Sequence, residues 1–318
     1  MDLNKFMQDG AEPQSEEKNR MSKEEYAAAK KQEREEVWAE IDTTAQAVFQ
    51  DGDSLKGFLD FMAQCKPQKT PNLLLLYSQN PQIQQVMTFD KIKSEGYSLR
   101  PGVHSYKFLV TNDYEKDGVM MQGTNVGKAY DISQIRMRPP EMPEPKSMDT
   151  LLRALLTNPE VPVRIADNLP EGVQAQYIPR QRAVYVRNGM SETTTFHAIN
   201  QEQACASLDA HNGSYTRSKA AIKGYCAAYV VGKKYGVDVS GFQFGKVCEL
   251  MENGNKDPKE LRSFIGDVRN ASYGISSHLN RNLGEQEQEF VTDAFSISEG
   301  QPAEQSGKKG KAKKAPER

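Results

Sequence analysis

Four prolines within a short stretch divide this chain into two predicted domains. The stretch from Arg138 to Pro145 reads Arg-Pro-Pro-Glu-Met-Pro-Glu-Pro. Proline has no backbone N–H to donate, so such a stretch continues neither a helix nor a central strand. We therefore expect a linker over residues 138–147, and a chain of 318 residues is long enough for about two domains.

Composition excludes two classes of protein. The mean hydropathy is −0.72, and the longest apolar runs, such as Leu73–Leu76, fall far short of the ~20 residues that span a bilayer. A net charge of −2 excludes a uniformly basic nucleic-acid coat, although it permits a local basic patch. We expect a protein without a membrane partner.

The ends of the chain and its cysteines suggest the compartment. Residues 1–34 are mostly charged and polar, unlike a signal peptide, and we expect them to be disordered at first and then the solvated start of a helix. The four cysteines have no Cys-x-x-Cys spacing and are too sparse for a disulfide framework. A cytoplasmic location is the expectation.

The first predicted domain, residues 35–137, begins with helices and continues with strands. Apolar residues recur at helical spacing over 37–49 and again over 55–62, with an N-cap expected at Asp53 or Ser54. A short helix with a proline in its first turn is predicted over 71–78. Glycines then separate short apolar runs between Phe89 and Ile135, which predicts several short antiparallel strands.

The second predicted domain, residues 148–283, mixes helices and strands. We expect strands at 163–165, 173–177 and 183–187, and helices at 148–156, 191–211, 217–235 and 257–282. Ser191 is a good N-cap for the second of these helices. The remaining residues, 284–318, predict a disordered basic tail, and the chain as a whole is expected to be α+β.

One helical segment comes close to a zinc peptidase motif. His-Glu-x-x-His places two imidazoles on one helix face with a glutamate base between them. Here the corresponding residues are Gln201-Glu202-Gln203-Ala204-Cys205, so the glutamate is present and both histidines are absent. Cys205 is able to ligate as a thiolate, but a catalytic zinc site uses three protein ligands.

Two interpretations of this segment stay open. His197 lies on the same face as Cys205, but eight residues or about 12 Å along the axis separate them, so both cannot bind one ion. In the plainer interpretation Cys205 packs as a small buried residue and Glu202 is capped or solvated. In the other, Glu202 and Cys205 belong to a metal site with an unrecognised further ligand.

Four short motifs follow one another in the first half of the chain. They are Phe58-Leu59-Asp60-Phe61-Met62, the run from Asn72 to Pro81, the stretch from Phe89 to Gly102, and Tyr130-Asp131-Ile132-Ser133-Gln134. Their order resembles that of the ArdC-type antirestriction family of plasmids and other mobile elements. In that family an N-terminal domain that binds single-stranded DNA precedes a zincin-like metallopeptidase domain. The resemblance therefore implies a bacterial protein of a mobile genetic element, with single-stranded DNA as its partner.

The second half also resembles that family, but its metal motif is degraded. Tyr185-Val186-Arg187 and the helix after Ser191 look like the strand and helix that carry the motif. The region expected to supply an acidic ligand reads Lys223-Gly224-Tyr225-Cys226, without a carboxylate. The resemblance thus implies a zincin-like pseudo-metallopeptidase that serves as a scaffold or binds a protein partner. We expect no metal and no cofactor, with zinc only under the alternative of an active enzyme.

Basic, aromatic and amide side chains of the first domain are the candidates for contacting DNA. Single strands are bound by positive charge and aromatic platforms. The expected DNA-binding residues are Asn72, Gln79, Lys93, Arg100, Tyr106, Lys107 and Arg136. Strand alternation places Tyr106 and Phe108 on the face opposite Lys107. Asn72 and Gln79 share a helix face, and they bond either nucleotide edges or neighbouring backbone.

Overall fold

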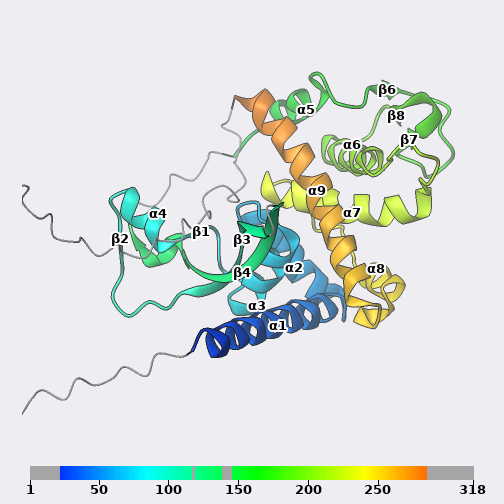
Figure 1. Ribbon diagram of the computed structural model, residues 1–318. Helices are drawn as coiled ribbons and strands as arrows, with labels where there is room; N and C mark the ends of the chain where they lie inside the picture. Colours follow the sequence, from blue (N-terminus) through cyan, green and yellow to red (C-terminus); the bar gives the residue numbers. More distant parts are fainter. Residues whose placement is uncertain (1–21, 117–118, 138–144, 285–318) are drawn as a thin grey trace, which may run out of the picture.

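The structure of this chain is a computed structural model, and it describes residues 22–116, 119–137 and 145–284 (Figure 1). It contains helices and mainly antiparallel sheets, so the α+β prediction is confirmed. Within these residues no helix is both long enough and apolar enough to cross a membrane. The predicted disordered segments and most of the proline-rich linker lie outside the described residues.

Three helices open the described chain: α1 (Lys23–Val48), α2 (Gly52–Gln64) and α3 (Thr70–Gln79). Helix α1 begins well before its apolar stripe, because Ser22 and Glu25 form a capping box. The predicted cap of α2 at Asp53 or Ser54 is wrong. Asp51 caps this helix instead, and its carboxylate accepts a hydrogen bond from the Ser54 N–H at 2.7 Å.

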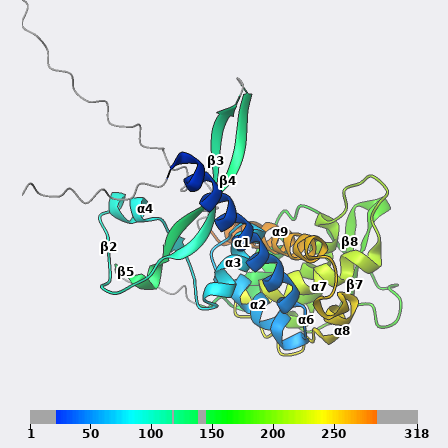
Figure 2. The same cartoon turned by 60° about the horizontal axis from the view of Figure 1, so that its bottom comes forward.

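A long hairpin replaces the several short strands expected from the glycine spacing. Strands β3 (Tyr106–Lys116) and β4 (Val119–Asp131) pair antiparallel along their full length, and β1 (Val86–Met87) pairs with the far end of β4. Gly123 and Gly127 lie inside β4 because side chains of β3 cover them. A Cβ at Gly123 would lie only 3.0 Å from the Tyr114 ring. Figure 2 shows the hairpin projecting from the body beside the start of α1.

Helix α3 closes the outer edge of β3 with two side-chain amides. The Asn72 amide donates to the Leu109 carbonyl at 2.9 Å and accepts from the Leu109 N–H at 2.8 Å. The Gln79 amide makes the same pair of bonds with the backbone of Lys107, at 3.0 and 2.7 Å. An edge strand normally leaves such groups unpaired, so these amides act as a substitute for a neighbouring strand.

A small lobe follows the third helix and carries its own apolar cluster. It consists of α4 (Phe89–Ser94), β2 (Ser98–Leu99), the 3₁₀ turn η2 (Ile132–Gln134) and β5 (Ile135–Arg136), with β2 antiparallel to β5. Met87, Ile92 and Ile135 form the buried centre of this lobe. The buried Asp131 carboxylate at the end of β4 accepts from the Ser133 N–H of η2 at 3.0 Å, which ties the lobe to the hairpin, and it also accepts from the N–H groups of Gln84 and Gln85 before β1.

The second half has one mixed sheet and five helices among the described residues. The sheet has the order β6-β8-β7, in which β6 (Val163–Ile165) is parallel and β7 (Ala175–Ile178) antiparallel to β8 (Ala183–Val186). The helices are α5 (Met148–Leu156), α6 (Glu192–Ser207), α7 (Arg217–Lys234), α8 (Gly245–Leu250) and α9 (Pro258–Leu283). Helix α8 was not expected, because six residues carry too little periodicity to be recognised.

Helix α6 ends earlier than its predicted limit near His211. The Asp209 carboxylate accepts from the His211 N–H at 2.8 Å, and His211 has a left-handed φ of 56°. A side chain that bonds backbone two residues ahead favours a turn over a helix. The expected cap at Ser191 is confirmed, since its hydroxyl accepts from the Thr194 N–H.

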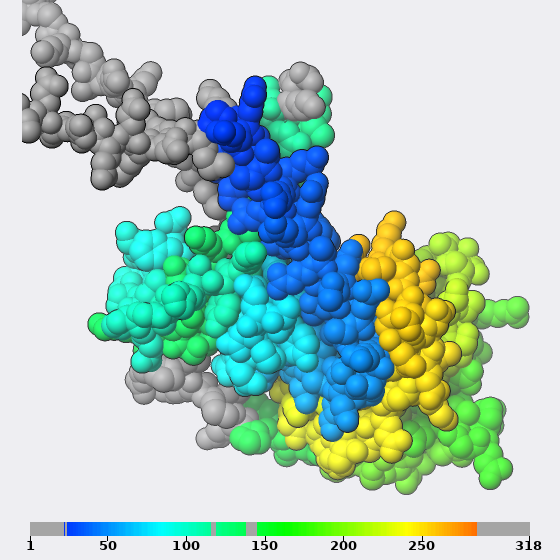
Figure 3. All heavy atoms as spheres, turned by 90° about the horizontal axis from the view of Figure 1, so that it is seen from below, coloured from blue at the N-terminus to red at the C-terminus, as the bar shows by residue number. Residues whose placement is uncertain are grey.

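The two sides of the linker share one hydrophobic core. Phe49 of α1 packs edge-on against Phe264 of α9, with 5.3 Å between ring centroids. The Tyr229 hydroxyl of α7 donates to the Asp60 carboxylate of α2 at 2.7 Å. Figure 3 shows α1 lying between the α3 region and α9 on one face of the molecule. The halves therefore pack as one body.

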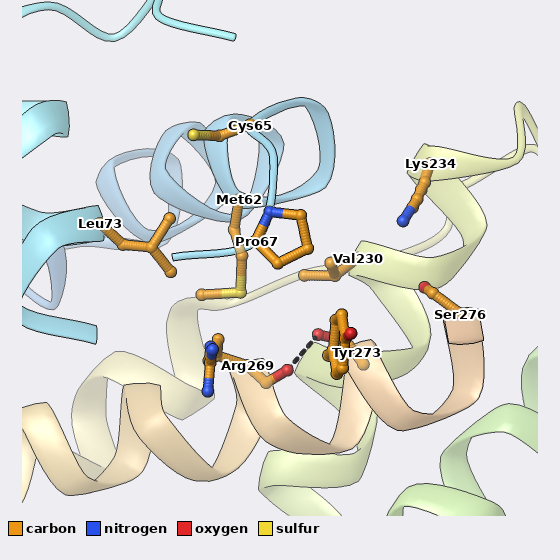
Figure 4. A pocket seen from close by; sticks show the side chains of 10 residues that line it. Met62, Cys65, Pro67, Leu73, Val230, Lys234, Arg269, Tyr273 and Ser276 are labelled. Atoms are coloured by element: carbon orange, nitrogen blue, oxygen red, sulfur yellow. Dashed lines mark hydrogen bonds between the residues drawn. The ribbon is translucent and has the colours of Figure 1, made fainter. Parts of the chain in front are cut away.

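A small cavity marks the place where α2, α7 and α9 meet. Its volume is about 30 Å³, and Met62, Val230 and Arg269 are among the residues that line it (Figure 4). Burial lowers the pKa of the Arg269 guanidinium, which Asn270 and other neighbours contact. A space of this size holds a water molecule rather than a ligand.

The hydrogen bonds that Asn72 of α3 makes to the edge of β3 can be tested by substitution. Asn72→Ala leaves the buried N–H and C=O of Leu109 without partners, so we expect the free energy of unfolding to fall by about 2–3 kcal/mol. Asn72→Asp keeps the acceptor but places a buried carboxylate oxygen against the Leu109 carbonyl oxygen, so it should destabilise the protein at least as much as Asn72→Ala. Urea denaturation measures both, and Gln243→Ala, which truncates an exposed amide side chain of the second half, serves as the control. Equal stability of Asn72→Ala and the control would contradict the edge closure.

Candidate functional site

Glu202 lies buried between α6, β7 and the start of α7. Its side chain is 2% exposed. One carboxylate oxygen accepts from the Tyr177 N–H at 2.7 Å and is also in close contact with the Arg217 guanidinium. The other oxygen accepts from Arg217 Nη2 at 2.6 Å. Arg217 and Glu202 thus form a two-pronged ion pair.

This pair corrects the expectation that Glu202 is capped or solvated. The hydrogen bond to Glu202, together with the carboxylate charge, raises the pKa of Arg217, while burial opposes this shift. A general base needs a free carboxylate lone pair directed at water, and here both oxygens are engaged by the guanidinium and a backbone amide. In this arrangement the Glu202 carboxylate holds β7 and the start of α7 together.

Sequence reasoning treated Arg217 only as the first residue of a helix. A signal was present, because the first turn of a helix favours negative side chains and disfavours a cation. An arginine at that position therefore needs a carboxylate elsewhere. Arg217 lies 15 residues after Glu202, so a short sequence motif does not contain both residues of the pair.

Cys205 packs in the core one turn beyond Glu202. Burial first, and then the Glu202 charge, raise the pKa of its thiol to about 12. Its cluster includes Tyr177, Val184 and Ala220. Helices α6 and α7 approach most closely at Gly224, where a Cβ would lie 2.9 Å from the Cys205 sulfur. The expectation of a small buried packing residue agrees with these contacts.

The histidines nearby are also engaged. His197 lies against Gly232, and its Nε2 is 2.8 Å from the Asp238 carbonyl oxygen. Burial lowers the pKa of this imidazole, although the Asp238 carbonyl and charge oppose the shift. His211 contacts Asp209, whose carboxylate also accepts from the Tyr177 hydroxyl at 3.0 Å. Within the described part of the chain, no three His, Cys, Asp or Glu side chains gather in a way that could hold a metal.

A polar cleft opens onto the ion pair. Its volume is about 250 Å³, and residues 172–175, Ala198, Gln201, Glu202 and Arg217 line it. The cleft lies between the loop that leads into β7 and one face of α6. Of the two charged side chains, Arg217 is 39% exposed and Glu202 only 2%, so the solvent in the cleft reaches mainly the guanidinium.

The predicted DNA-contacting residues fall into three groups. Asn72 is buried and Gln79 half-buried, and both amides bond the backbone of β3. Of the two roles left open by the sequence, the structure thus gives them the backbone role. Tyr106 is half-buried, and its hydroxyl accepts from Asn80 at 2.9 Å.

The second group consists of Lys107 and of Lys128, which was not among the predicted DNA-binding residues. Lys107 of β3 and Lys128 of β4 are direct partners in the hairpin register, and both are exposed. Neither makes an ion pair with a carboxylate among the described residues. Tyr106 and Phe108 lie on the face opposite Lys107, as strand alternation predicted, and Phe108 is buried.

The third group lies on the small lobe. Lys93 Nζ is 4.7 Å from the centre of the exposed Phe89 ring. Arg136 of β5 pairs in register with Ser98 of β2, and the Arg100 N–H donates to the Gln134 carbonyl just beyond that pair. All three basic side chains are exposed. The lobe therefore presents basic groups beside an aromatic ring.

Thiol reactivity tests the placement of Cys205. Burial raises the pKa of all four cysteines, to about 12 at Cys65 and about 11 at Cys248. Only the thiolate reacts, so we expect the native protein at pH 8 to react with an aromatic disulfide reagent at least about a hundredfold more slowly than a free thiol. After unfolding, four thiols per chain should react. One fast native thiol, absent in Cys205→Ala, would contradict the packing role.

Comparison with known proteins gives a family match for the first half of the chain. Residues 31–137 match the family model described as the N-terminal domain of anti-restriction factor ArdC. The chain is also similar to the metal-free crystal structure of the antirestriction ArdC protein from plasmid R388, with 10% identity and a TM-score of 0.49. That match covers 77% of this chain and 98% of the other. A comparison with curated proteins finds no match.

A second structure of the R388 protein corrects one expectation. It is described as Mn(II)-bound, and it matches with 11% identity and a TM-score of 0.46 over 70% of this chain and 96% of the other. The prediction of no cofactor is therefore wrong for a protein of this type, and we withdraw it. The residues around Glu202 do not fit a divalent cation, because Arg217 neutralises the carboxylate and burial keeps the Cys205 thiol protonated.

The resemblance drawn from the sequence is confirmed in the first half. The family match spans α1 from residue 31, α2, α3, the hairpin and the small lobe, and it ends at residue 137, where the proline-rich linker was predicted. Residues 31–137 of this chain therefore match the N-terminal domain of the ArdC-type antirestriction family.

Proposed function

We propose that this protein binds single-stranded DNA through the hairpin and small lobe of its ArdC-type domain, as an antirestriction protein of a mobile genetic element. The support comes from the charges and aromatic rings that the domain presents to solvent. Single-strand binding needs cations along the backbone and flat surfaces for the bases. Both kinds of group occur on the described surface.

The pairing of Lys107 with Lys128 carries the proposal. Like charges placed directly opposite in an antiparallel pair destabilise the sheet. Their Cβ atoms are about 4.5–5.5 Å apart in such pairs, so one phosphate is able to contact both ammonium groups. Such a contact converts the repulsion into attraction and releases counterions. Two lysines placed opposite each other therefore destabilise the hairpin less when an anion is bound between them.

Exposed aromatic rings supply the second requirement. Tyr114 is 45% exposed, and its ring lies over Gly123 on the neighbouring strand. This contact holds one side of the ring next to the neighbouring strand, and the exposed part of the side chain is open to a base. Phe89 with Lys93 above it gives a second platform on the small lobe. Base stacking on such rings contributes about 1–3 kcal/mol per base.

From the predicted DNA-binding residues we retain Lys93, Arg100, Tyr106, Lys107 and Arg136, and we propose to add Lys128 and Tyr114. Tyr106 acts with Asn80 to hold the base of the hairpin. Asn72 and Gln79 act indirectly, because they fix the backbone that carries Lys107. We place this function in the cytoplasm, since the four cysteines of the chain are free.

For the second half we propose a zincin-like scaffold or protein-binding module that does not use Glu202 as a peptidase base. The Glu202–Arg217 pair supports this proposal, because a base held by a guanidinium does not activate water. The competing function is a peptidase that uses Glu202 and Cys205. The contacts of both side chains oppose it.

Charge substitutions on the hairpin test DNA binding. In Lys107→Gln/Lys128→Gln the affinity for a labelled single-stranded 20-mer should fall about ten- to thirtyfold at 0.1 M salt. The slope of log affinity against log salt should also flatten by about 1.4. Fluorescence anisotropy across a salt series measures both. Wild type should bind duplex DNA of the same length more weakly.

The matched control is Lys246→Gln/Lys259→Gln, which removes the same charge from exposed positions of the second half. Its affinity and salt slope should equal those of wild type after a common correction for net charge. Equal losses in both double variants, or no binding by wild type at low salt, would contradict the proposed interface.

The buried ion pair gives a second test. Arg217→Met leaves the Glu202 carboxylate without its partner, and loss of one partner from a buried pair costs about 3–5 kcal/mol of unfolding free energy. Because the Arg217 side chain is 39% exposed, water replaces part of the interaction, and we expect about 2–3 kcal/mol. Glu202→Gln/Arg217→Met should recover part of this loss.

The control for the pair is Arg153→Met, which breaks the exposed Asp149–Arg153 pair and should change stability little. Urea denaturation compares the three variants with wild type. A peptidase activity in the wild type that Glu202→Gln abolishes would contradict the structural role of Glu202.

A further inference from the structure

An apolar groove lies beside β6, on the far side of the second half from the ion pair. Its volume is about 520 Å³. Its apolar lining comes from Leu156, Pro159, Pro162, Val163, Ile165, Val186, Met190 and Ile199. Two of these side chains are open to solvent, Leu156 at 45% and Ile165 at 67%. No described residue covers them.

Strand β6 offers free backbone groups along this groove. It lies at the end of the order β6-β8-β7, so one of its edges has no neighbouring strand among the described residues. Val184 donates to the Pro162 carbonyl and Ala166 donates to the Val186 carbonyl. Because the pattern alternates, the backbone groups of Val163 and Ile165 face away from β8. Such an edge is a template for an added strand.

The end of α9 is fixed next to the groove. Asn282 Nδ2 donates to the carbonyl oxygens of Ala154 and Thr157, at 2.8 and 2.9 Å, and His278 Nε2 lies 3.2 Å from the Leu155 carbonyl. These bonds hold the last turn of α9 against the last turn of α5, which carries Leu156. Figure 1 shows α5 between the end of α9 and β6. The chain therefore leaves the body at Gly284 close to the groove.

The residues that follow Gly284 match the groove in chemistry. Residues 285–289 are polar, and they precede Phe290-Val291-Thr292-Asp293-Ala294-Phe295-Ser296-Ile297-Ser298. Aromatic and β-branched residues favour strands, and apolar and polar residues alternate from Phe295 onward. Six residues from Gly284 to Phe290 reach at most about 20 Å. This length is enough to pass the last turn of α5.

The segment after Gly284 and the groove carry opposite charges. Glu287, Glu289 and Asp293 give the segment a negative charge, whereas Arg164 and Arg187 line the groove. The Arg187 guanidinium donates to the carbonyls of Leu169 and Pro170, so its charge is not neutralised by a carboxylate there. An acidic apolar segment of the same chain therefore fits this surface better than a basic one.

We propose that residues 290–297 dock in the groove of their own chain and pair with the free edge of β6. The docked segment covers Leu156 and Ile165, adds a strand to the sheet and fixes the starting point of the basic residues 308–314. It thus protects an exposed edge from pairing with other molecules. This inference is independent of the proposed DNA binding.

Hydrogen exchange of the full chain tests the proposal. In wild type the amides of Val163 and Ile165 should exchange at least about tenfold more slowly than in Phe295→Asp/Ile297→Asp, because the edge is then uncovered. The matched control, Ser296→Asp/Ser298→Asp, adds the same charge at the alternate positions and should keep most of the protection. These substitutions change no side chain of the described residues, and far-UV circular dichroism checks that each variant is folded.

A synthetic peptide of residues 288–299, added to Phe295→Asp/Ile297→Asp, should restore the slow exchange. Equal exchange in wild type and in this variant would overturn the proposal. Protection that rises with protein concentration, together with a dimer in sedimentation, would also overturn it and assign the groove to a second copy. Protection that is independent of concentration is the expected result.

Discussion

The whole molecule depends on the apolar face of α9. Its buried residues recur every three or four positions, at Leu261, Phe264, Ile265, Val268, Ala271, Ile275 and Leu279, which gives a continuous stripe about 27 Å long. This stripe packs against α1 and α3 from one side of the linker and against α5, α6 and α7 from the other. Because the last described helix packs into the core of the family-matched region, that region and the rest of the described chain are expected to unfold together.

In the hairpin, the backbone groups at the outer edge of β3 are hydrogen-bonded without a further strand. Helix α3 bonds the backbone of Leu109 and Lys107 through Asn72 and Gln79, whose spacing of seven residues brings both amides to one face. The outer part of the hairpin beyond these bonds carries exposed side chains, including Tyr114, Met120 and Met121. The base is thus rigid and the outer part is open to a partner. This division suits a binding element that is presented by a fixed support.

Much of the fold could be predicted from the sequence, because helix caps and apolar periodicity are local signals. The starts of α5, α6 and α7 were predicted within a residue, and Ser191 caps α6 as expected. The long hairpin was not predicted, because glycines such as Gly123 and Gly127 usually interrupt a strand. In the folded chain the side chains of Tyr114 and Val110 lie over these glycines, and the strand continues through them. Arg217 was missed for the same reason: its role depends on Glu202, which is near only in the folded chain. The family match covers residues 31–137, so the motif order was informative where single motifs were weak.

The opposed lysines of the hairpin have a consequence for the free protein. Added salt screens the repulsion between Lys107 and Lys128 within a Debye length of about 10 Å at 0.1 M, and so steadies the hairpin when nothing is bound. The same salt weakens the attraction of both lysines for phosphate. Under the proposed DNA binding, high salt therefore stabilises the free hairpin and low salt favours the complex. The repulsion between the two lysines destabilises the free hairpin, and a bound phosphate would remove that repulsion.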